Sequence, residues 1–95
     1  MLTSKQRAKL KSIASTADTI GQIGKLGLND TTYEQVSQAL AARELVKYRV
    51  LETCPLSPRE AAELLAEKTG AQVVQVIGSR IVLYRPNPEK PVIQL

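Results

Sequence analysis

Residues 57–85 read SPREAAELLAEKTGAQVVQVIGSRIVLYR, and this stretch predicts one helix followed by two strands. The helix start is marked by Ser57 as N-cap, Pro58 in the first turn and Glu60 three residues after the cap. Gly70 suits the helix end, because a glycine adopts the left-handed conformation that commonly follows the last turn. The apolar residues in between recur at helical spacing, and those expected on the buried side are Ala61, Leu64 and Leu65.

The second half of this stretch predicts a β-hairpin. Two runs rich in Val, Ile and Leu, residues 72–77 and 80–85, are separated by Gly78-Ser79, a pair that favours a tight primed turn. The two strands should therefore pair antiparallel. Three prolines then interrupt the pattern, so we expect a single domain over residues 1–86 and an extended or disordered tail over residues 87–95.

Four further elements are expected upstream, each from its own local pattern. They are a helix over residues 3–16, a strand over 19–23, a helix from a capping box of Thr31 and Glu34 to about Arg43, and an alternating strand over 45–51. The resulting order, α-β-α-β-α-β-β, predicts an α/β fold, a two-layer sandwich with a mixed four-stranded sheet. Right-handed crossovers place the second and third helices on one face, and the other face is open unless the first helix covers it.

Composition narrows the chemistry that the domain can perform. The 95 residues include no histidine, so the commonest general base at neutral pH and a common zinc ligand are both missing. Cys54 is alone and can form neither an internal disulfide nor a CxxC metal site. We therefore expect no enzymatic activity, no cofactor and no metal. Without a signal peptide or a long apolar run, a soluble, cytoplasmic protein is expected. We also expect a monomer.

The net charge of +4 is unevenly distributed along the chain. The first 25 residues hold Lys5, Arg7, Lys9, Lys11 and Lys25 against Asp18 alone, whereas the remainder is balanced. This asymmetry indicates a polyanionic partner, either nucleic acid or anionic lipid, although the first helix could also present an ordinary solvated face. Lipid is the weaker alternative, because that helix has no bulky aromatic side chain to insert. An acidic stripe on the third helix, which a polyanion would avoid, consists of Glu60, Glu63 and Glu67.

A loop of the type GxxG, Gly24-Lys25-Leu26-Gly27, connects the first strand to the second helix. Glycines allow a phosphate to approach the main chain, whose N–H groups and following helix N-terminus favour an anion. Two glycines at this spacing also occur in ordinary tight connections, so the prediction of phosphate binding depends on the surrounding cations. Those outside the first helix and the loop are Arg43, Lys47, Arg49, Arg80 and Arg85. Neither a dinucleotide motif nor a Walker A motif fits, and three tyrosines are too few for a base-stacking platform.

Four blocks of the chain closely resemble the CRM domain family in its stand-alone bacterial, YhbY-type form. They are LTSKQRAKL at 2–10, IGKLGL at 23–28, ARELVKYRVL at 42–51 and AELLAEKTGAQVVQVIGSRIVLYRP at 62–86. The resemblance implies a fold similar to the C-terminal domain of bacterial translation initiation factor three. It also implies binding of structured RNA, in bacteria in precursors of the large ribosomal subunit.

The resemblance also implies which residues contact RNA. It places the GxxG loop on Gly24, Lys25, Leu26 and Gly27, and the basic surface on Lys5, Arg7, Lys9, Lys11, Arg43 and Lys47. Family members often carry Lys-Pro shortly before the first strand, where this chain has the less basic sequence TADT at 16–19. The alternative hypothesis is a protein-interaction module that docks a ribosomal or translation protein.

Overall fold

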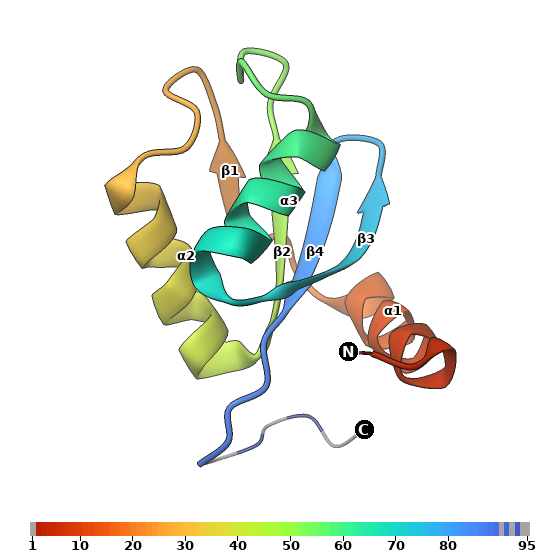
Figure 1. Ribbon diagram of the computed structural model, residues 1–95. Helices are drawn as coiled ribbons and strands as arrows, with labels where there is room; N and C mark the ends of the chain where they lie inside the picture. The colour runs from red at the N-terminus through yellow and green to blue at the C-terminus, as the bar shows by residue number, and fades with distance from the viewer. Residues whose placement is uncertain (1, 90, 92, 94–95) are drawn as a thin grey trace.

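The computed structural model describes residues 2–89, 91 and 93, and its elements follow the expected order (Figure 1). They are α1 (Ser4–Thr16), β1 (Gly21–Ile23), α2 (Asp30–Arg43), β2 (Leu45–Val50), α3 (Pro58–Thr69), β3 (Gln72–Ile77) and β4 (Arg80–Tyr84). The α/β class and the mixed four-stranded sheet are thereby confirmed.

The sheet has the strand order β1-β2-β4-β3. β1 runs parallel to β2 with Gly21 opposite Tyr48, and β4 pairs antiparallel with both β2 and β3. The predicted hairpin is confirmed, and Gly78 in its turn has a φ of 56°, which an L side chain rarely adopts. β1 and β3 are the edge strands, and the open edge of β1 becomes important for the candidate site.

The main core lies between the sheet and the two helices α2 and α3, which cover the same face as expected (Figure 1). Ser57 and Glu60 form the predicted capping box, with N–H···O distances of 3.1 and 3.2 Å. Leu64, expected to be buried, is only partly covered, and Ala62 is fully buried in this core. The buried members are Ile23, Val36, Leu40, Val46, Tyr48, Val50, Ala61, Ala62, Leu65, Ile81 and Leu83.

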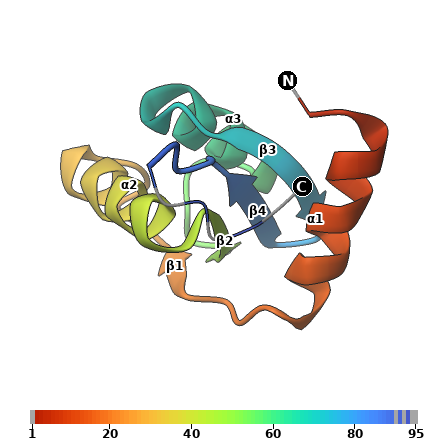
Figure 2. The same cartoon turned by 90° about the horizontal axis from the view of Figure 1, so that it is seen from below.

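Helix α1 covers part of the opposite face of the sheet, over β2, β3 and β4 (Figure 2). The first helix is thus the element that covers the second face of the sheet, which the sequence did not decide. Leu10 and Ala14 of the helix are buried there against Leu45, Val74, Val82 and Tyr84. The protein therefore has two small aliphatic cores, one on each side of the sheet.

A β-bulge in β3, which no sequence pattern indicated, allows this strand to serve both cores. The register shifts between Val73 and Gln75, so that Val73 faces α2 and α3 while Val74 faces α1. Arg7 of α1 donates from Nη1 to the carbonyl oxygens of Val73 and Val74, at 2.5 and 3.2 Å. A cation that was expected to face a ligand thus fastens α1 to the bulge.

The predicted capping box of α2 is wrong. The helix begins two residues earlier than a Thr31 cap would place it, at Asp30, and Asn29 is the N-cap, its Oδ1 accepting from the Thr32 N–H at 2.9 Å. Asparagine is at least as good an N-cap as threonine, so two competing caps stood two residues apart in this stretch. The core-facing positions of the helix are nevertheless as predicted, because Val36 and Leu40 are buried.

Glu44 ends α2 and also holds the chain that follows β4. It is fully buried, has a φ of 64°, and its carboxylate accepts the N–H groups of Asn87 and Ile93 at 2.5 and 2.6 Å. The described residues of the predicted tail form neither helix nor strand, but two of them are fixed to this carboxylate. The rest of that prediction, residues 90, 92, 94 and 95, lies outside the described residues.

Candidate nucleic-acid interface

The GKLG loop (Gly24–Gly27) is a tight turn in which the Gly27 N–H donates to the Gly24 carbonyl at 2.9 Å. Gly27 has a φ of 65°, and a Cβ there would lie 3.2 Å from Cγ of Pro55, so the backbone itself requires glycine. A Cβ on Gly24 would make only an ordinary contact, 3.4 Å from Cδ1 of Leu51. The backbone conformation therefore requires a glycine at position 27 but not at position 24.

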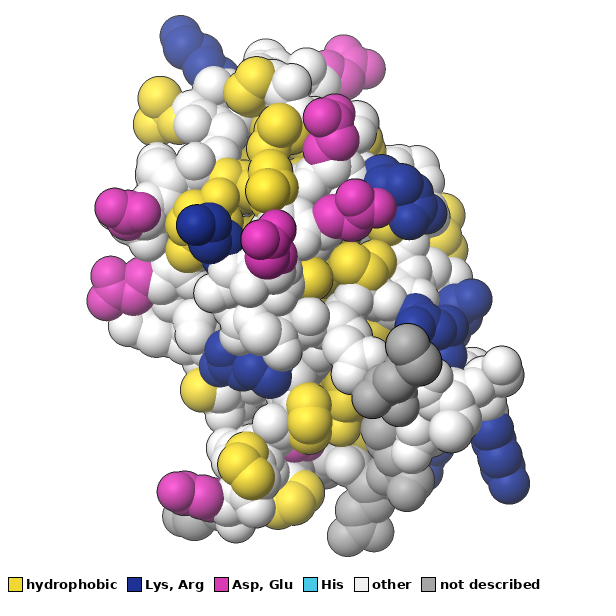
Figure 3. Space-filling model, in the orientation of Figure 1, with side chains coloured by type: hydrophobic (Ala, Val, Ile, Leu, Met, Phe, Trp, Pro, Cys, Tyr) yellow, Lys and Arg dark blue, Asp and Glu magenta, His cyan; other side chains and the backbone are white. Residues whose placement is uncertain are grey.

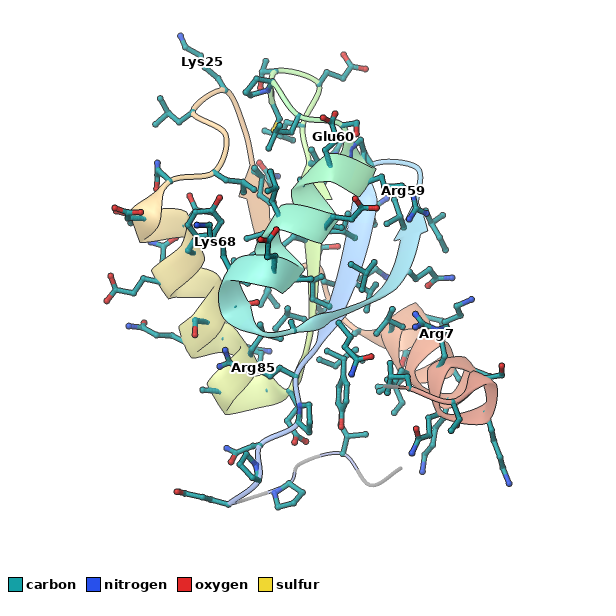
Figure 4. All side chains as sticks on the ribbon, in the orientation of Figure 1. Arg7, Lys25, Arg59, Glu60, Lys68 and Arg85 are labelled. Carbon is teal, nitrogen blue, oxygen red and sulfur yellow. The ribbon has the colours of Figure 1, made fainter. Side chains whose placement is uncertain are left out.

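The tip of the GKLG loop presents Lys25 and Leu26 to solvent. Figure 4 shows the Lys25 side chain directed away from the body of the protein, and Leu26 is 82% exposed. Within the described part of the chain, the N–H groups of Lys25 and Leu26 have no acceptor, whereas that of Gly27 is used inside the turn. The tip therefore offers two amide donors, one cation and one apolar side chain to a partner.

The loop forms one wall of a groove of about 720 Å³, which we call the loop groove. β1, the edge strand, forms its floor, and one face of α2 forms the opposite wall. The polar residues of this wall, from the N-cap and the helix, carry amide, hydroxyl and guanidinium groups, namely Asn29, Thr32, Gln35 and Arg43, and the apolar Val36 and Ala39 lie among them. Lys25 and Arg43 both line this groove, and no carboxylate does. The structure thus places Arg43 and the GxxG loop in the lining of one groove, at opposite ends of α2.

Gly21 and Tyr48 shape the floor of the loop groove. A Cβ on Gly21 would lie 2.8 Å from Cε1 of Tyr48, so the glycine allows the tyrosine ring to lie against β1. Burial raises the pKa of Tyr48, and the positive charge of Arg43 partly opposes this increase. The ring is 9% exposed and belongs to the core, so it does not provide a base-stacking surface.

The expected cations of α1 do not form one surface with the loop groove. Figure 1 places the GKLG loop and α1 at opposite ends of the molecule, on different sides of the sheet. Lys5, Lys9 and Lys11 are exposed on α1, whereas Arg7 is held by the bulge in β3. The predicted basic surface is therefore divided into at least two parts.

Two further cations have structural contacts that sequence patterns did not reveal. Lys47 Nζ donates at 3.0 Å to the carbonyl of Ala14 in the last turn of α1, which also accepts from the Ala17 N–H at 3.1 Å. Arg85 donates to Ser37 of α2 and to the carbonyl of Thr69 in α3, with distances from 2.7 to 3.0 Å (Figure 4). Arg85 ties the two helices together and lies outside the loop groove.

The outer face of α2 and α3 is the acidic side of the protein. Figure 3 shows acidic side chains spread over this face, and Glu60, Glu63 and Glu67 are exposed on α3 as expected. Arg59 forms an ion pair with Glu63 at 3.8 Å. Hydrogen bonds from Ser57 lower the pKa of Glu60, which keeps this carboxylate ionised to a lower pH. A polyanion would be repelled here, so the basic grooves are the better candidates.

Metal binding and membrane crossing are two other functions that the described residues can be compared with. These residues contain no group of three or more His, Cys, Asp or Glu side chains placed to hold a metal ion. No helix within the same part of the chain combines the length and apolarity required to cross a membrane.

The fold and the loop groove define a small α/β domain whose GxxG turn shares a groove with β1 and α2, and sequence comparison identifies its class. Residues 2–85 match the CRS1/YhbY (CRM) domain. The chain belongs to this family, so the resemblance drawn from the four sequence blocks is confirmed.

Three relatives show how the whole chain compares with other members. It is 43% identical over 95 residues to a Bacillus subtilis protein named "Probable RNA-binding protein YqeI", covering 100% of this chain and 99% of the relative. A Haemophilus influenzae "RNA-binding protein" is 31% identical, with coverages of 93% and 89%. A probable RNA-binding protein of Methanocaldococcus jannaschii is 33% identical, with coverages of 90% and 64%. These names describe RNA-binding proteins and not enzymes, in agreement with the composition.

A solved structure confirms the fold independently. The solution structure of a hypothetical protein from Staphylococcus aureus superimposes with a TM-score of 0.82 at 45% identity, covering 100% of this chain and 99% of the other. The arrangement of three helices around a mixed sheet is therefore shared across these two chains.

Proposed function

We propose that this protein binds structured RNA, and that its target is ribosomal RNA or a precursor of the large ribosomal subunit in the cytoplasm. The observation that carries the proposal is the loop groove, whose lining includes Lys25 at the GKLG tip and Arg43 at the far end of α2 and includes no carboxylate. The names of the relatives support RNA as the partner. The protein acts as a monomer that binds and positions RNA without catalysis.

Phosphate contact at the loop tip is the first step of this mechanism. A phosphate oxygen can accept from the N–H groups of Lys25 and Leu26, which have no acceptor among the described residues, while the Lys25 ammonium neutralises its charge. Gly24 keeps the approach to these amides free of a side chain. The exposed Leu26 side chain provides an apolar contact for a ribose or a base.

The wall formed by α2 supplies the second step. Arg43 lies at the C-terminal end of the helix, where its guanidinium can hold a further phosphate bidentately. The side chains of Asn29, Thr32 and Gln35 lie between this residue and the loop and can bond to sugar hydroxyls and base edges. RNA is preferred over DNA by such contacts to the 2′-hydroxyl.

A titration with Lys25→Ala/Arg43→Ala tests the loop groove. The probe is a transcript of a large-subunit ribosomal RNA domain, and the matched control is Arg59→Ala on the acidic face. With two phosphate contacts removed, the slope of log affinity against log salt should change by about 2 and affinity should fall about 30-fold at about 0.15 M salt. Unchanged values for the double variant would remove the loop groove from the RNA surface.

Gly24→Ala separates a functional from a structural role of the loop. Because the new methyl group makes only an ordinary contact with Leu51, the thermal midpoint should change little while RNA affinity falls. Crosslinking in cells, followed by sequencing of the attached RNA, tests the ribosomal target. Recovery of no RNA, together with nuclease-resistant co-purification of a translation protein, would favour the protein-interaction alternative.

A further inference from the structure

The face of the sheet that α1 covers continues beyond this helix, toward the β3–β4 turn. Strand register places Lys47 and Arg49 of β2 on this face, together with Arg80 of β4. Gln22 of β1 lies opposite Arg49, and Ile77 of β3 lies opposite Arg80. This part of the sheet, which we call the open sheet face, is therefore rich in cations and has no acidic residue at these positions.

A groove of about 200 Å³ joins the open sheet face to α1. Lys11 reaches it from the helix, and Lys47 and Arg80 reach it from the sheet. The remaining lining residues are neutral, namely Ala14, Ser15, Gln75, Ile77 and Val82. Because Lys47 is fixed at 3.0 Å from the Ala14 carbonyl, its charge is held at this groove in the folded protein.

Arg49 and Arg80 are direct cross-strand partners, and both are exposed. Like charges in this arrangement repel one another, because their Cβ atoms lie only about 5 Å apart. Their partners in the register on either side, Gln22 and Ile77, are uncharged. The free protein thus carries an unfavourable pair that a bound anion would relieve.

The open sheet face and the loop groove meet at the edge strand β1. Arg49 pairs with Gln22, which lies two residues before the GKLG loop begins, and the Leu51 N–H donates to the Ile23 carbonyl at 2.8 Å. Gln22 itself also lines the loop groove. One RNA molecule can therefore reach both surfaces around the edge of β1.

We propose that Arg49 and Arg80, with Lys11 and Lys47, form a second phosphate-binding site that takes another segment of the same structured RNA. This inference rests on the proposed function. Guanidinium groups bind phosphate oxygens bidentately, and the two ammonium groups extend the positive potential along the groove. Ile77, which is 61% exposed, provides an apolar surface for a ribose. The two surfaces on either side of β1 select a folded RNA over a short single strand.

The experiment compares two double variants on one probe, an RNA hairpin with a single-stranded 3′ extension. Arg49→Gln/Arg80→Gln tests the open sheet face, and Lys25→Ala/Arg43→Ala tests the loop groove, with Arg59→Gln as the control. The sheet variant should lose about 30-fold in affinity at about 0.15 M salt and reduce the salt slope by about 2. Arg49→Lys/Arg80→Lys should recover part of this loss, because it restores charge without the guanidinium fork.

Thermal unfolding of the same variants excludes a merely structural explanation. Removing two like charges from directly opposite positions should raise the midpoint of Arg49→Gln/Arg80→Gln, although RNA affinity falls. Unchanged affinity and slope in this variant, while the loop variant weakens, would overturn the second site and leave the proposed function intact. Wild-type protein that binds no RNA would refute the proposed function itself. A third outcome concerns anionic lipid vesicles. If the wild-type protein binds them, and Arg49→Gln/Arg80→Gln abolishes this binding without changing RNA binding, the open sheet face is a membrane-binding surface and the inference is overturned.

Discussion

Arg7→Ala should lower stability and leave the RNA surface intact, although Arg7 belongs to the most basic stretch of the chain. Its Nη1 donates to the Val73 and Val74 carbonyls, which are 66 and 67 residues away in sequence. A hydrogen bond from a charged donor stabilises a protein by about 1.5–3 kcal/mol. Because the two carbonyls share one nitrogen of a partly exposed side chain, their contributions do not add in full. We therefore expect a loss of about 2 kcal/mol, or about 8–16 °C in the unfolding midpoint of a domain of this size.

Lys5→Ala is the matched control for this prediction, because Lys5 lies on the exposed side of the same helix and loses the same charge. Urea denaturation followed by circular dichroism measures stability, and RNA titration at several salt concentrations measures the number of phosphate contacts. Arg7→Ala should shift the urea midpoint and retain the salt slope. The reasoning fails if Arg7→Ala unfolds at the same urea concentration as Lys5→Ala and reduces the salt slope.

Three further predictions concern other parts of the fold. Glu44→Gly should lower the free energy of unfolding in urea by about 2–4 kcal/mol, because the loss of a buried, hydrogen-bonded carboxylate outweighs the relief of the positive φ at this position. A gain in stability would contradict this. Gly27→Ala should lower the thermal midpoint more than Gly24→Ala, since only Gly27 has a left-handed φ, and equal midpoints would contradict the assignment of the turn. Burial raises the pKa of Tyr48 and Tyr84 in the folded protein. As the pH rises above about 10, these tyrosines therefore ionise in the unfolded chain before they ionise in the folded protein, and the free energy of unfolding decreases. Tyr84→Phe should reduce this decrease in urea midpoints measured from about pH 9 to about pH 12, and an unchanged decrease would exclude Tyr84 as a source.

Elements that depend on local chemistry could be predicted from the sequence. The Ser57 capping box and the Gly78-Ser79 turn each act within a few residues, so their patterns identify them directly. The start of α2 was mispredicted because Asn29 and Thr31 are both good caps, and local propensity does not distinguish between them. Leu28 packs against the main core immediately before the cap, and this tertiary contact accompanies the earlier start.

The candidate site could be predicted only in part, for a related reason. The GKLG loop has a sequence signature, and the resemblance implied Arg43 as part of a basic surface, but the groove that these residues share is seen only in the structure. No pattern distinguishes a cation that faces solvent from one that donates to a distant main-chain carbonyl. Arg7, Lys47 and Arg85 all do the latter, with acceptors between 16 and 67 residues away. Their roles depend on the β-bulge and on helix packing, which are tertiary features.

The fold separates charge more strongly than the sequence does. Along the chain, residues 26–95 carry equal numbers of acidic and basic side chains, which suggests that this part is electrostatically neutral. In space, the carboxylates of α3 lie on the outer face of the two helices, whereas Arg49 and Arg80 lie on the other side of the sheet. An oriented molecule of this kind attracts a polyanion to one side and repels it from the other, so charge selects the binding face before any specific contact forms. The net charge therefore understates how strongly the basic side of this domain can attract a polyanion.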